Sequence, residues 1–443
     1  MPFNTKIYIF WNNLYLYMKF KIGDYVEVKT STDVIKATIV KIGENLILKL
    51  DSGYNTGIKK KDIKAIKVLN HVKYDKKPKK IIKENPYLKK ISILHTGGTI
   101  ASKVDYRTGA VFASFTPEDI LSLDPELRNI ANFSSRLVSN MWSDDLRFKH
   151  FSVLAKEIEK EVKKGVEGII ISMGTDNLAV ASAALSFIIS PTPIPIILVG
   201  AQRSSDRGSS DAAMNLICAS KFITNTDFAD VAICMHNSMS DEFCLILPAC
   251  KTKKLHSSRR DAFKVVNDTP IAQVSYKGTE INFNKSHYKK KGEKLFIKPG
   301  MEEKIGLLKI HINMFASEFK SFRGFKGLVI EGTGLGHMPL DVIDRYTKEH
   351  SKIRKSLQDL IKSGTIIVMT TTCLFGKVNM NVYSKGIDLL NIGVISGEDM
   401  LSETALVKLS WLLGNYNKER AKELIRKNLR GEINERITAE FSL

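Results

Sequence analysis

Cysteine is scarce in this chain, and its spacing argues against two kinds of site. Five cysteines occur in 443 residues. They lie at Cys218, Cys234, Cys244, Cys250 and Cys373, with no Cys-x-x-Cys pair. An odd number without close pairing argues against a disulfide framework and a structural zinc site, and is typical of a reducing compartment. The chain also has no HExxH motif, so we expect it to bind no metal.

A long hydrophobic run is also missing. The apolar segment 7–18 is interrupted by Asn12 and Asn13. It is too short to cross a membrane, and no small-residue cleavage site of a signal peptide follows it. We therefore expect a cytoplasmic protein without a membrane segment. Residues 1–17 are expected to lie outside the folded core, and Met18 is an alternative start of the chain.

Acidic residues are outnumbered, and the excess of positive charge is uneven. Lysine and arginine total 67 against 47 acidic residues, a net charge of +20. Half of it falls in residues 59–90, where thirteen lysines face three acidic residues. Such a charge attracts RNA or an acidic membrane surface, but a solvated linker gives the same pattern. Because Tyr74 and Tyr87 are the only aromatics there, a base-stacking platform is not expected.

The first part of the chain reads as a small β domain. Short β-rich runs at 25–28, 35–42 and 46–50 are separated by glycine-containing turn signals. Their spacing predicts a small barrel of the SH3 or Tudor type over residues 18–70. The lysine-rich segment 71–88 is expected to be a linker.

From residue 89 the pattern changes to buried strands alternating with amphipathic helices, which predicts a doubly wound α/β fold with parallel sheets. We expect an N-terminal α/β domain at 89–283, a basic linker at 284–303 and a C-terminal α/β domain at 304–443. Strands are predicted at Ile91–Leu94, Gly168–Ser172, Pro195–Val199, Asp230–Met235, Gly327–Ile330 and Thr365–Met369, with a hairpin over 271–283. Helices are predicted at Leu178–Ile189, Asp211–Thr224, Asp341–Lys348, Ile353–Ser363 and Ser402–Leu413.

Two threonine-containing turns follow predicted strands. Thr96-Gly97-Gly98-Thr99 comes after one strand, and Gly174-Thr175-Asp176 comes after the next. The carboxyl ends of parallel strands meet at one edge of a sheet, where ligands bind. A threonine hydroxyl needs a base to become a nucleophile, and glycines let backbone N–H groups approach an oxyanion. The pair suggests nucleophilic catalysis, although an ordinary turn and a helix cap at Asp176 explain the same residues.

Two further polar segments follow later strands. The loop 200–211 contains Arg203 and Arg207, but the GxxxxGK[ST] spacing of a phosphate loop is absent. Three lysines occur in the segment 251–254. A lysine brought close to Thr175 and Asp176 could help to move a proton, but nothing in the local sequence distinguishes Lys254 from its neighbours.

These motifs resemble the two signatures of the bacterial-type L-asparaginase/glutaminase family, over residues 89 to the C-terminus. Three features resemble one branch of that family, the D subunits of archaeal glutamyl-tRNA(Gln) amidotransferases. They are the N-terminal barrel with the segment Leu50–Asn55, the segment Asp105–Val111, and the loop Ala201–Asn215 together with Glu331–His337. The resemblance implies an asparaginase-like pair of α/β domains. It also implies glutamine hydrolysis by a homodimer within a heterotetramer, with ammonia passed to the E subunit of the amidotransferase. That partner would use ATP and Mg²⁺ to convert Glu-tRNA(Gln) to Gln-tRNA(Gln), and this chain would need no cofactor.

The resemblance also implies roles for individual residues. Thr99 matches the primary nucleophile, and Tyr106 matches the tyrosine of a loop that closes over it. The second-threonine triad corresponds to Thr175, Asp176 and Lys254. The residues that hold the α-carboxylate and α-amine of the substrate correspond to Ser143 and Asp144, while Gly98 and Gly174 keep the approach to both hydroxyls open.

Three positions depart from the family pattern. Met173 replaces the usual histidine, Asn177 the usual threonine, and Gly208 a proline that is frequent in this branch. Two alternatives therefore stand beside the glutaminase interpretation. One is a free-standing L-asparaginase, and the other is a non-catalytic tRNA-binding scaffold on the same fold.

Overall fold

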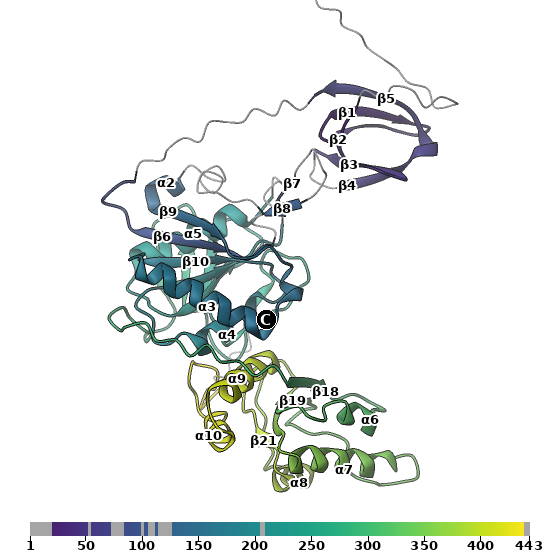
Figure 1. Cartoon of the computed structure of the whole chain (residues 1–443), viewed down its shortest axis with the longest axis vertical. Helices are drawn as coiled ribbons and strands as arrows, with labels where there is room; N and C mark the ends of the chain where they lie inside the picture. Colours follow the sequence, from purple (N-terminus) through teal and green to yellow (C-terminus); the bar gives the residue numbers. More distant parts are fainter. Residues whose placement is uncertain are drawn as a thin grey trace, which may run out of the picture.

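The computed structural model describes residues 20–51, 55–71, 84–98, 126–203 and 209–437, together with the backbone of 102–104 and 111–113. Figure 1 shows a small β domain at the top, a large α/β domain in the middle and a smaller α/β domain below it. Thr99, Tyr106, Arg207 and Gly208 lie outside the described residues, as do the extension 1–17 and most of the linker 71–88.

The small β domain is a five-stranded antiparallel sheet in the order β4-β3-β2-β1-β5. Its strands are β1 (Tyr25–Thr30), β2 (Val34–Ile42), β3 (Asn45–Leu50), β4 (Asn55–Lys59) and β5 (Ile63–Asn70). Alternate side chains such as Val26, Val28, Leu46 and Leu48 form its own buried core, as the period of a strand requires. This confirms the expected antiparallel β region, although sequence reasoning identified neither β4 nor the lysine-rich β5.

The large domain has a mixed sheet, in which the expected parallel strands are extended by antiparallel ones, including the hairpin expected over 271–283. Five strands are parallel, and β13, β16 and β17 continue the sheet in antiparallel fashion. The connection 237–242 is too short for a parallel crossover, which explains why β13 turns back on β12. From one edge to the other the strands are β17 (Ile281–Phe283), β16 (Ala272–Ser275), β13 (Phe243–Pro248), β12 (Val231–His236), β11 (Ile196–Val199), β10 (Gly168–Ser172), β6 (Lys90–His95) and β9 (Asn132–Leu137).

Helices cover both faces of this sheet. Ile169 and Ile171 of β10 belong to the core that contains α3 (Phe148–Lys163) and α4 (Leu178–Ile188). Ile170 between them belongs to the core on the opposite face, with α5 (Ala212–Asn225) and the short α2 (Leu127–Ile130). Buried strands with apolar side chains on both faces are the reason for the continuous apolar runs in the sequence.

The smaller domain confirms the second α/β unit, with four parallel strands in the order β18-β19-β20-β21. They are β18 (Ile305–Lys309), β19 (Gly327–Gly332), β20 (Ile366–Thr371) and β21 (Ile395–Ser396). Its helices are α6 (Ala316–Lys320), α7 (Glu349–Lys362), α8 (Ser384–Ile392), α9 (Ser402–Asn415) and α10 (Lys418–Leu424). Two short pairs complete the structure: β7 (Ser102–Val104) with β8 (Val111–Ala113), and β14 (Thr252–Lys254) with β15 (Phe263–Val265).

The helix predicted at Asp341–Lys348 is wrong. The Asp344 carboxylate accepts hydrogen bonds from the backbone nitrogens of Tyr346 at 2.9 Å and Thr347 at 3.0 Å. The Thr347 hydroxyl accepts one from the nitrogen of Ile343 at 2.8 Å. These side-chain bonds give the backbone an alternative to helical bonds, and helix α7 begins only at Glu349.

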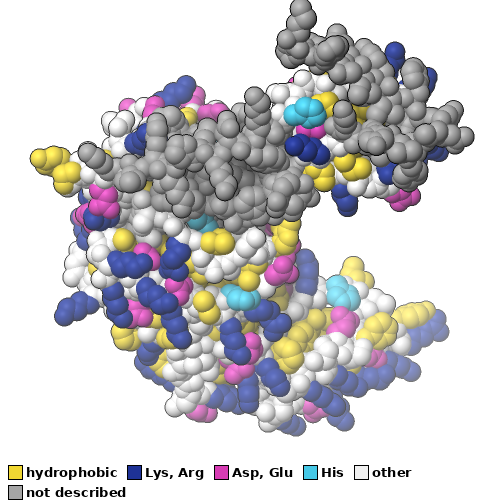
Figure 2. All heavy atoms as spheres, turned by 45° about the horizontal axis from the view of Figure 1, so that its top comes forward, with side chains coloured by type: hydrophobic (Ala, Val, Ile, Leu, Met, Phe, Trp, Pro, Cys, Tyr) yellow, Lys and Arg dark blue, Asp and Glu magenta, His cyan; other side chains and the backbone are white. Residues whose placement is uncertain are grey.

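Positive charge is not gathered in one strip of the visible surface. Figure 2 shows Lys and Arg side chains spread over both α/β domains, with acidic side chains between them. Among the described helices, none has the length and apolar composition needed to cross a membrane.

The two α/β domains are joined through a buried seam. Helix α4 packs on α9, and the rings of Phe187 and Trp411 stack with centroids 5.8 Å apart. An ion pair also crosses between the domains: Lys251 Nζ lies 2.5 Å from Asp399 Oδ2, and neither side chain is exposed. A buried ion pair stabilises a fold only while both partners are present, since a lone buried charge is very costly.

We expect Asp399→Asn to lower the free energy of unfolding by about 3–5 kcal/mol, because Lys251 would be left charged and buried. Urea unfolding followed by circular dichroism measures this change. Glu159→Gln, which breaks the exposed pair with Lys163, is the control and should have almost no effect. Equal midpoints for the two variants would contradict the importance of the buried pair.

Candidate active site

The first threonine-containing turn continues directly from β6. Thr96 N donates to the carbonyl of Ser172 at 3.0 Å, and the carbonyl of Thr96 accepts from Met141 N at 3.1 Å. Gly97 and Gly98 follow with φ of +112° and +83°. Residues with side chains rarely adopt such angles, so this turn requires its two glycines.

The glycines also allow the backbone to pack closely. A Cβ atom on Gly98 would lie 2.4 Å from Gly174 N, and one on Gly97 would lie 2.3 Å from the carbonyl oxygen of Met141. At Gly98 the first turn therefore approaches the backbone of the turn after β10 directly. Any side chain at Gly98 would push the two turns apart.

The second turn carries a threonine and a carboxylate that share one lysine. Lys254, at the end of β14, donates from Nζ to Thr175 Oγ1 at 2.9 Å and to Asp176 Oδ1 at 2.7 Å. Thr175 is buried, and the Lys254 side chain is only 12 % exposed. The residue that precedes helix α4 is Asn177, while the carboxylate of Asp176 binds Lys254. Hydroxyl, amine and carboxylate thus form a connected chain, as an activated hydroxyl needs.

Ser143 packs against the second turn. It starts the short 3₁₀ helix Ser143–Asp145. Its hydroxyl accepts from Asn177 N at 3.3 Å, and its carbonyl accepts from Asn177 Nδ2 at 2.9 Å. A Cβ on Gly174 would lie 2.9 Å from the Ser143 hydroxyl oxygen. Asp144, the next residue, is exposed.

The structure therefore brings six of the nine proposed site residues together: Gly98, Ser143, Gly174, Thr175, Asp176 and Lys254. Asp144 adjoins them on the turn that contains Ser143. Thr99 and Tyr106 are the two that lie outside the described residues. Within the described part of the chain, no group of three His, Cys, Asp or Glu side chains could hold a metal ion.

The loop after β11 packs against the methyl group of Thr175. A Cβ on Gly200 would lie 2.6 Å from Thr175 Cγ2, and the carbonyl of Gly200 accepts from Asn215 Nδ2 at 2.9 Å. The buried Asp211 carboxylate accepts from the backbone nitrogens of Gln202 and Arg203, both at 3.0 Å. Sequence reasoning singled out this loop but missed the supporting roles of Asp211 and Asn215, because only the fold places them beneath Gly200.

His95 anchors the first turn from the end of β6. Its Nδ1 lies 2.6 Å from Ser172 Oγ, and its Nε2 lies 2.9 Å from Ser135 Oγ. The three residues belong to the neighbouring strands β6, β10 and β9. Burial lowers the pKa of His95 to about 4, so the imidazole is neutral at physiological pH.

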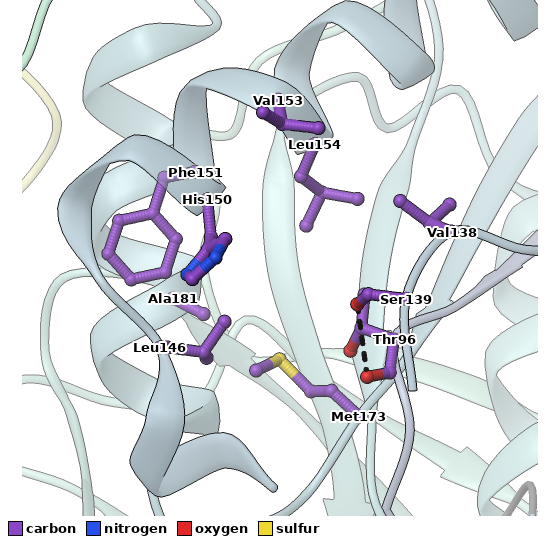
Figure 3. A pocket seen from close by; sticks show the side chains of 10 residues that line it. All are labelled: Thr96, Val138, Ser139, Leu146, His150, Phe151, Val153, Leu154, Met173 and Ala181. Atoms are coloured by element: carbon purple, nitrogen blue, oxygen red, sulfur yellow. Dashed lines mark hydrogen bonds between the residues drawn. The ribbon is translucent and has the colours of Figure 1, made fainter. Parts of the chain in front are cut away.

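Met173, one of the departures from the family pattern, faces an apolar cavity. The cavity has a volume of about 50 Å³ and lies on the α3 side of the sheet. Figure 3 shows Met173 pointing into it below Leu146 and Ala181, with Thr96 and Ser139 at its edge. A thioether adapts to such irregular apolar space. We therefore interpret Met173 as a packing residue rather than as a member of the triad.

Two family models match most of the chain. The model described as Asparaginase, N-terminal matches residues 90–289. The model described as Glutaminase/Asparaginase C-terminal domain matches residues 304–425.

Curated relatives match nearly the whole chain. A protein of Methanococcus maripaludis strain C6, named as the D subunit of glutamyl-tRNA(Gln) amidotransferase, is 44% identical over 95% of this chain and 99% of its own length. A protein of Pyrococcus furiosus with the same name is 42% identical over 93% of this chain and 95% of its own.

Solved structures match the two α/β domains. The L-asparaginase of Thermococcus kodakarensis has a TM-score of 0.68 at 28% identity. L-asparaginase I of Vibrio cholerae has a TM-score of 0.66 at 26% identity. Each alignment covers 78% of this chain and 99% of the other.

Gly98→Ala should lower the free energy of unfolding by about 3 kcal/mol, because backbone strain adds to the clash with Gly174. Gly165→Ala is a matched control, since Gly165 also has a positive φ of +80° but has nothing within 4 Å of a new Cβ. It should cost only about 1 kcal/mol. Chemical denaturation of both variants measures the difference, and equal losses would show that the contact with Gly174 is unimportant.

The burial of His95 predicts a dependence of stability on pH. Below about pH 6.5 the unfolded chain protonates this histidine, while the folded chain stays neutral until about pH 4. The free energy of unfolding therefore falls as the pH decreases through this window, by about 3 kcal/mol in total. His95→Gln should remove that contribution. Urea titrations of both proteins at pH 7, 6 and 5 test this, and parallel losses in the two would refute it.

Proposed function

The chain belongs to the asparaginase/glutaminase family, in the branch of glutamyl-tRNA(Gln) amidotransferase D subunits, and we propose that it hydrolyses glutamine to supply ammonia for that reaction. The observation that carries the proposal is the contact of Lys254 with both Thr175 and Asp176. In a non-catalytic scaffold on the same fold, nothing would require a lysine that is largely shielded from solvent beside Thr175 and Asp176.

The coverage of the relatives favours an amidotransferase component over a free-standing asparaginase. The asparaginase structures align over 99% of their own length, but the alignment leaves about a fifth of this chain unmatched. The amidotransferase relatives align over 93–95% of it. A free asparaginase has no need of the antiparallel β domain formed by β1 to β5, whereas the amidotransferase relatives share most of that length.

The proposed reaction is acyl transfer through a threonine. Thr99 Oγ attacks the side-chain amide carbon of glutamine, its proton passes to the leaving nitrogen, and ammonia departs. Water then attacks the ester carbonyl, which releases glutamate and restores the Thr99 hydroxyl. Backbone N–H groups at the glycine turns stabilise the oxyanion, and such donors contribute about 3 kcal/mol each.

The remaining site residues position the reacting groups and move the proton. Asp176 holds Lys254, and Lys254 holds the Thr175 hydroxyl, so a proton can pass between the amine and the hydroxyl. Ser143 and Asp144 bind the α-carboxylate and α-amine of glutamine, with Tyr106 closing over the substrate. Gly98 and Gly174 leave space for it beside the two hydroxyls.

The proposed setting is a cytoplasmic complex. Two copies of this chain assemble with two copies of the E subunit in a heterotetramer. The E subunit uses ATP and Mg²⁺ to activate Glu-tRNA(Gln), and the ammonia from this chain converts it to Gln-tRNA(Gln). This chain itself then needs no cofactor, and the complex is an ATP-dependent ligase.

Lys254→Met should lower kcat for glutamine by about 10²–10⁴-fold, as loss of a proton-transfer group does. Thr99→Ala should abolish turnover. The exposed Lys277, changed to Met, is the control and should leave the rate unchanged. Ammonia release is measured with glutamine and with asparagine, without and then with the E subunit, ATP, Mg²⁺ and Glu-tRNA(Gln).

Preference for glutamine together with a strong increase in rate on adding the charged tRNA complex is the expected result. Efficient asparagine hydrolysis with no response to tRNA would instead identify a free asparaginase. Tight tRNA binding without any amide hydrolysis would identify a scaffold.

A further inference from the structure

We propose that the C-terminal α/β domain positions the catalytic lysine, and that Glu403 is the positioning residue. The inference rests on the proposed function, because it takes Lys254 as a member of the triad. Glu403 lies in the first turn of α9, in a different domain from Thr175 and Asp176.

The strand that carries Lys254 has little support of its own. β14 is three residues long and pairs only with β15, itself three residues long. This pair is not part of the eight-stranded sheet. A hairpin of this size is at best marginally stable in water, so contacts from elsewhere must fix it. Some of them lie within the N-terminal domain, where Phe263 is buried in the core and the Thr252 hydroxyl donates to the carbonyl of Pro248 at 2.7 Å.

The other contacts come from one short segment of the C-terminal domain, residues 399–404. The carbonyl of Cys250 accepts from the Thr404 hydroxyl at 3.0 Å. Lys251 binds Asp399 within the buried seam, and Lys253 Nζ lies 2.5 Å from Glu403 Oε1. Three of the four residues that precede Lys254 are thus tied to the start of α9.

Glu403 is the charged residue of this segment that borders the same hollow as two members of the triad. A hollow of about 80 Å³ at the domain seam is lined by Asp176, Ala179, Val180, Thr252, Lys253, Lys254, Leu401, Glu403 and Thr404. Both carboxylates and both lysines therefore border the same space. With Lys253 held by Glu403, Lys254 is the lysine left to bind Asp176 and Thr175.

The ion pair between Lys253 and Glu403 is better placed to position Lys254 than to stabilise the fold. The side chains of Lys253 and Glu403 are 31 % and 37 % exposed, so neither charge is fully withdrawn from solvent, although Oε2 of Glu403 is itself buried. Partly exposed pairs contribute little to folding. A small displacement of a reacting group, by contrast, changes a rate strongly.

The test is steady-state glutaminase kinetics of the complete complex. Glu403→Gln and Lys253→Met should each lower kcat by about tenfold. KM for glutamine should change less than about twofold, because neither residue contacts the substrate. The double variant should be no slower than the slower single variant, since both changes remove one contact. Lys253→Arg keeps the ion pair and should retain the kcat of the unmodified chain.

Two controls separate positioning from a structural effect. Glu419→Gln, at an exposed position in the first turn of α10, removes a carboxylate of the same domain and should leave kcat unchanged. The thermal midpoint of each variant should stay within a few degrees of the unmodified protein, so a loss of kcat that follows a fall in midpoint would overturn the inference.

Unchanged kcat in both Glu403→Gln and Lys253→Met would also overturn it, and the proposed function would stand as long as Lys254→Met is inactive. If Lys254→Met keeps full activity, the triad assignment itself fails, and the positioning inference fails with it.

Discussion

The backbone contact between Gly98 and Gly174 is the constraint on which the rest of the site depends. Strands β6 and β10 are parallel neighbours in which His95 lies opposite Ser172, so their following turns reach the sheet edge together. The turns can meet only because neither has a side chain at the contact. Ser143, Thr175 and the loop after β11 then pack around this contact, which fixes where two hydroxyl-bearing segments face each other.

The parts of the fold that follow from hydrophobic pattern alone were predictable. Continuous apolar runs located β6, β10, β11, β12, β19 and β20 to within about two residues, because strands buried on both faces tolerate few polar residues. Strands with a mixture of buried and exposed side chains were not predicted. β9 is an edge strand whose Asn132 and Arg136 are half-buried, so its sequence lacks both an apolar run and a strict alternation.

Hydrogen bonds explain one wrong helix prediction and one residue whose role the sequence did not show. The segment 341–348 has an acceptable helical pattern, yet Asp344 and Thr347 bind nearby backbone nitrogens and hold a turn. His95 reads in the sequence as a strand-end residue. Its position between the hydroxyls of Ser135 and Ser172 depends on the pairing of three strands, and pairing partners are not encoded in any local pattern.

The three lysines of the segment 251–254 show why a site residue cannot always be read from its neighbours. In the sequence they are equivalent, whereas in the fold each has its own carboxylate. Lys251 binds Asp399, Lys253 binds Glu403, and Lys254 binds Asp176. Two of these carboxylates come from the C-terminal domain and one from the turn after β10. Opposite charges are therefore matched one to one, two pairs across the domain seam and one within the N-terminal domain. That matching, rather than local sequence, selects which amine meets Thr175.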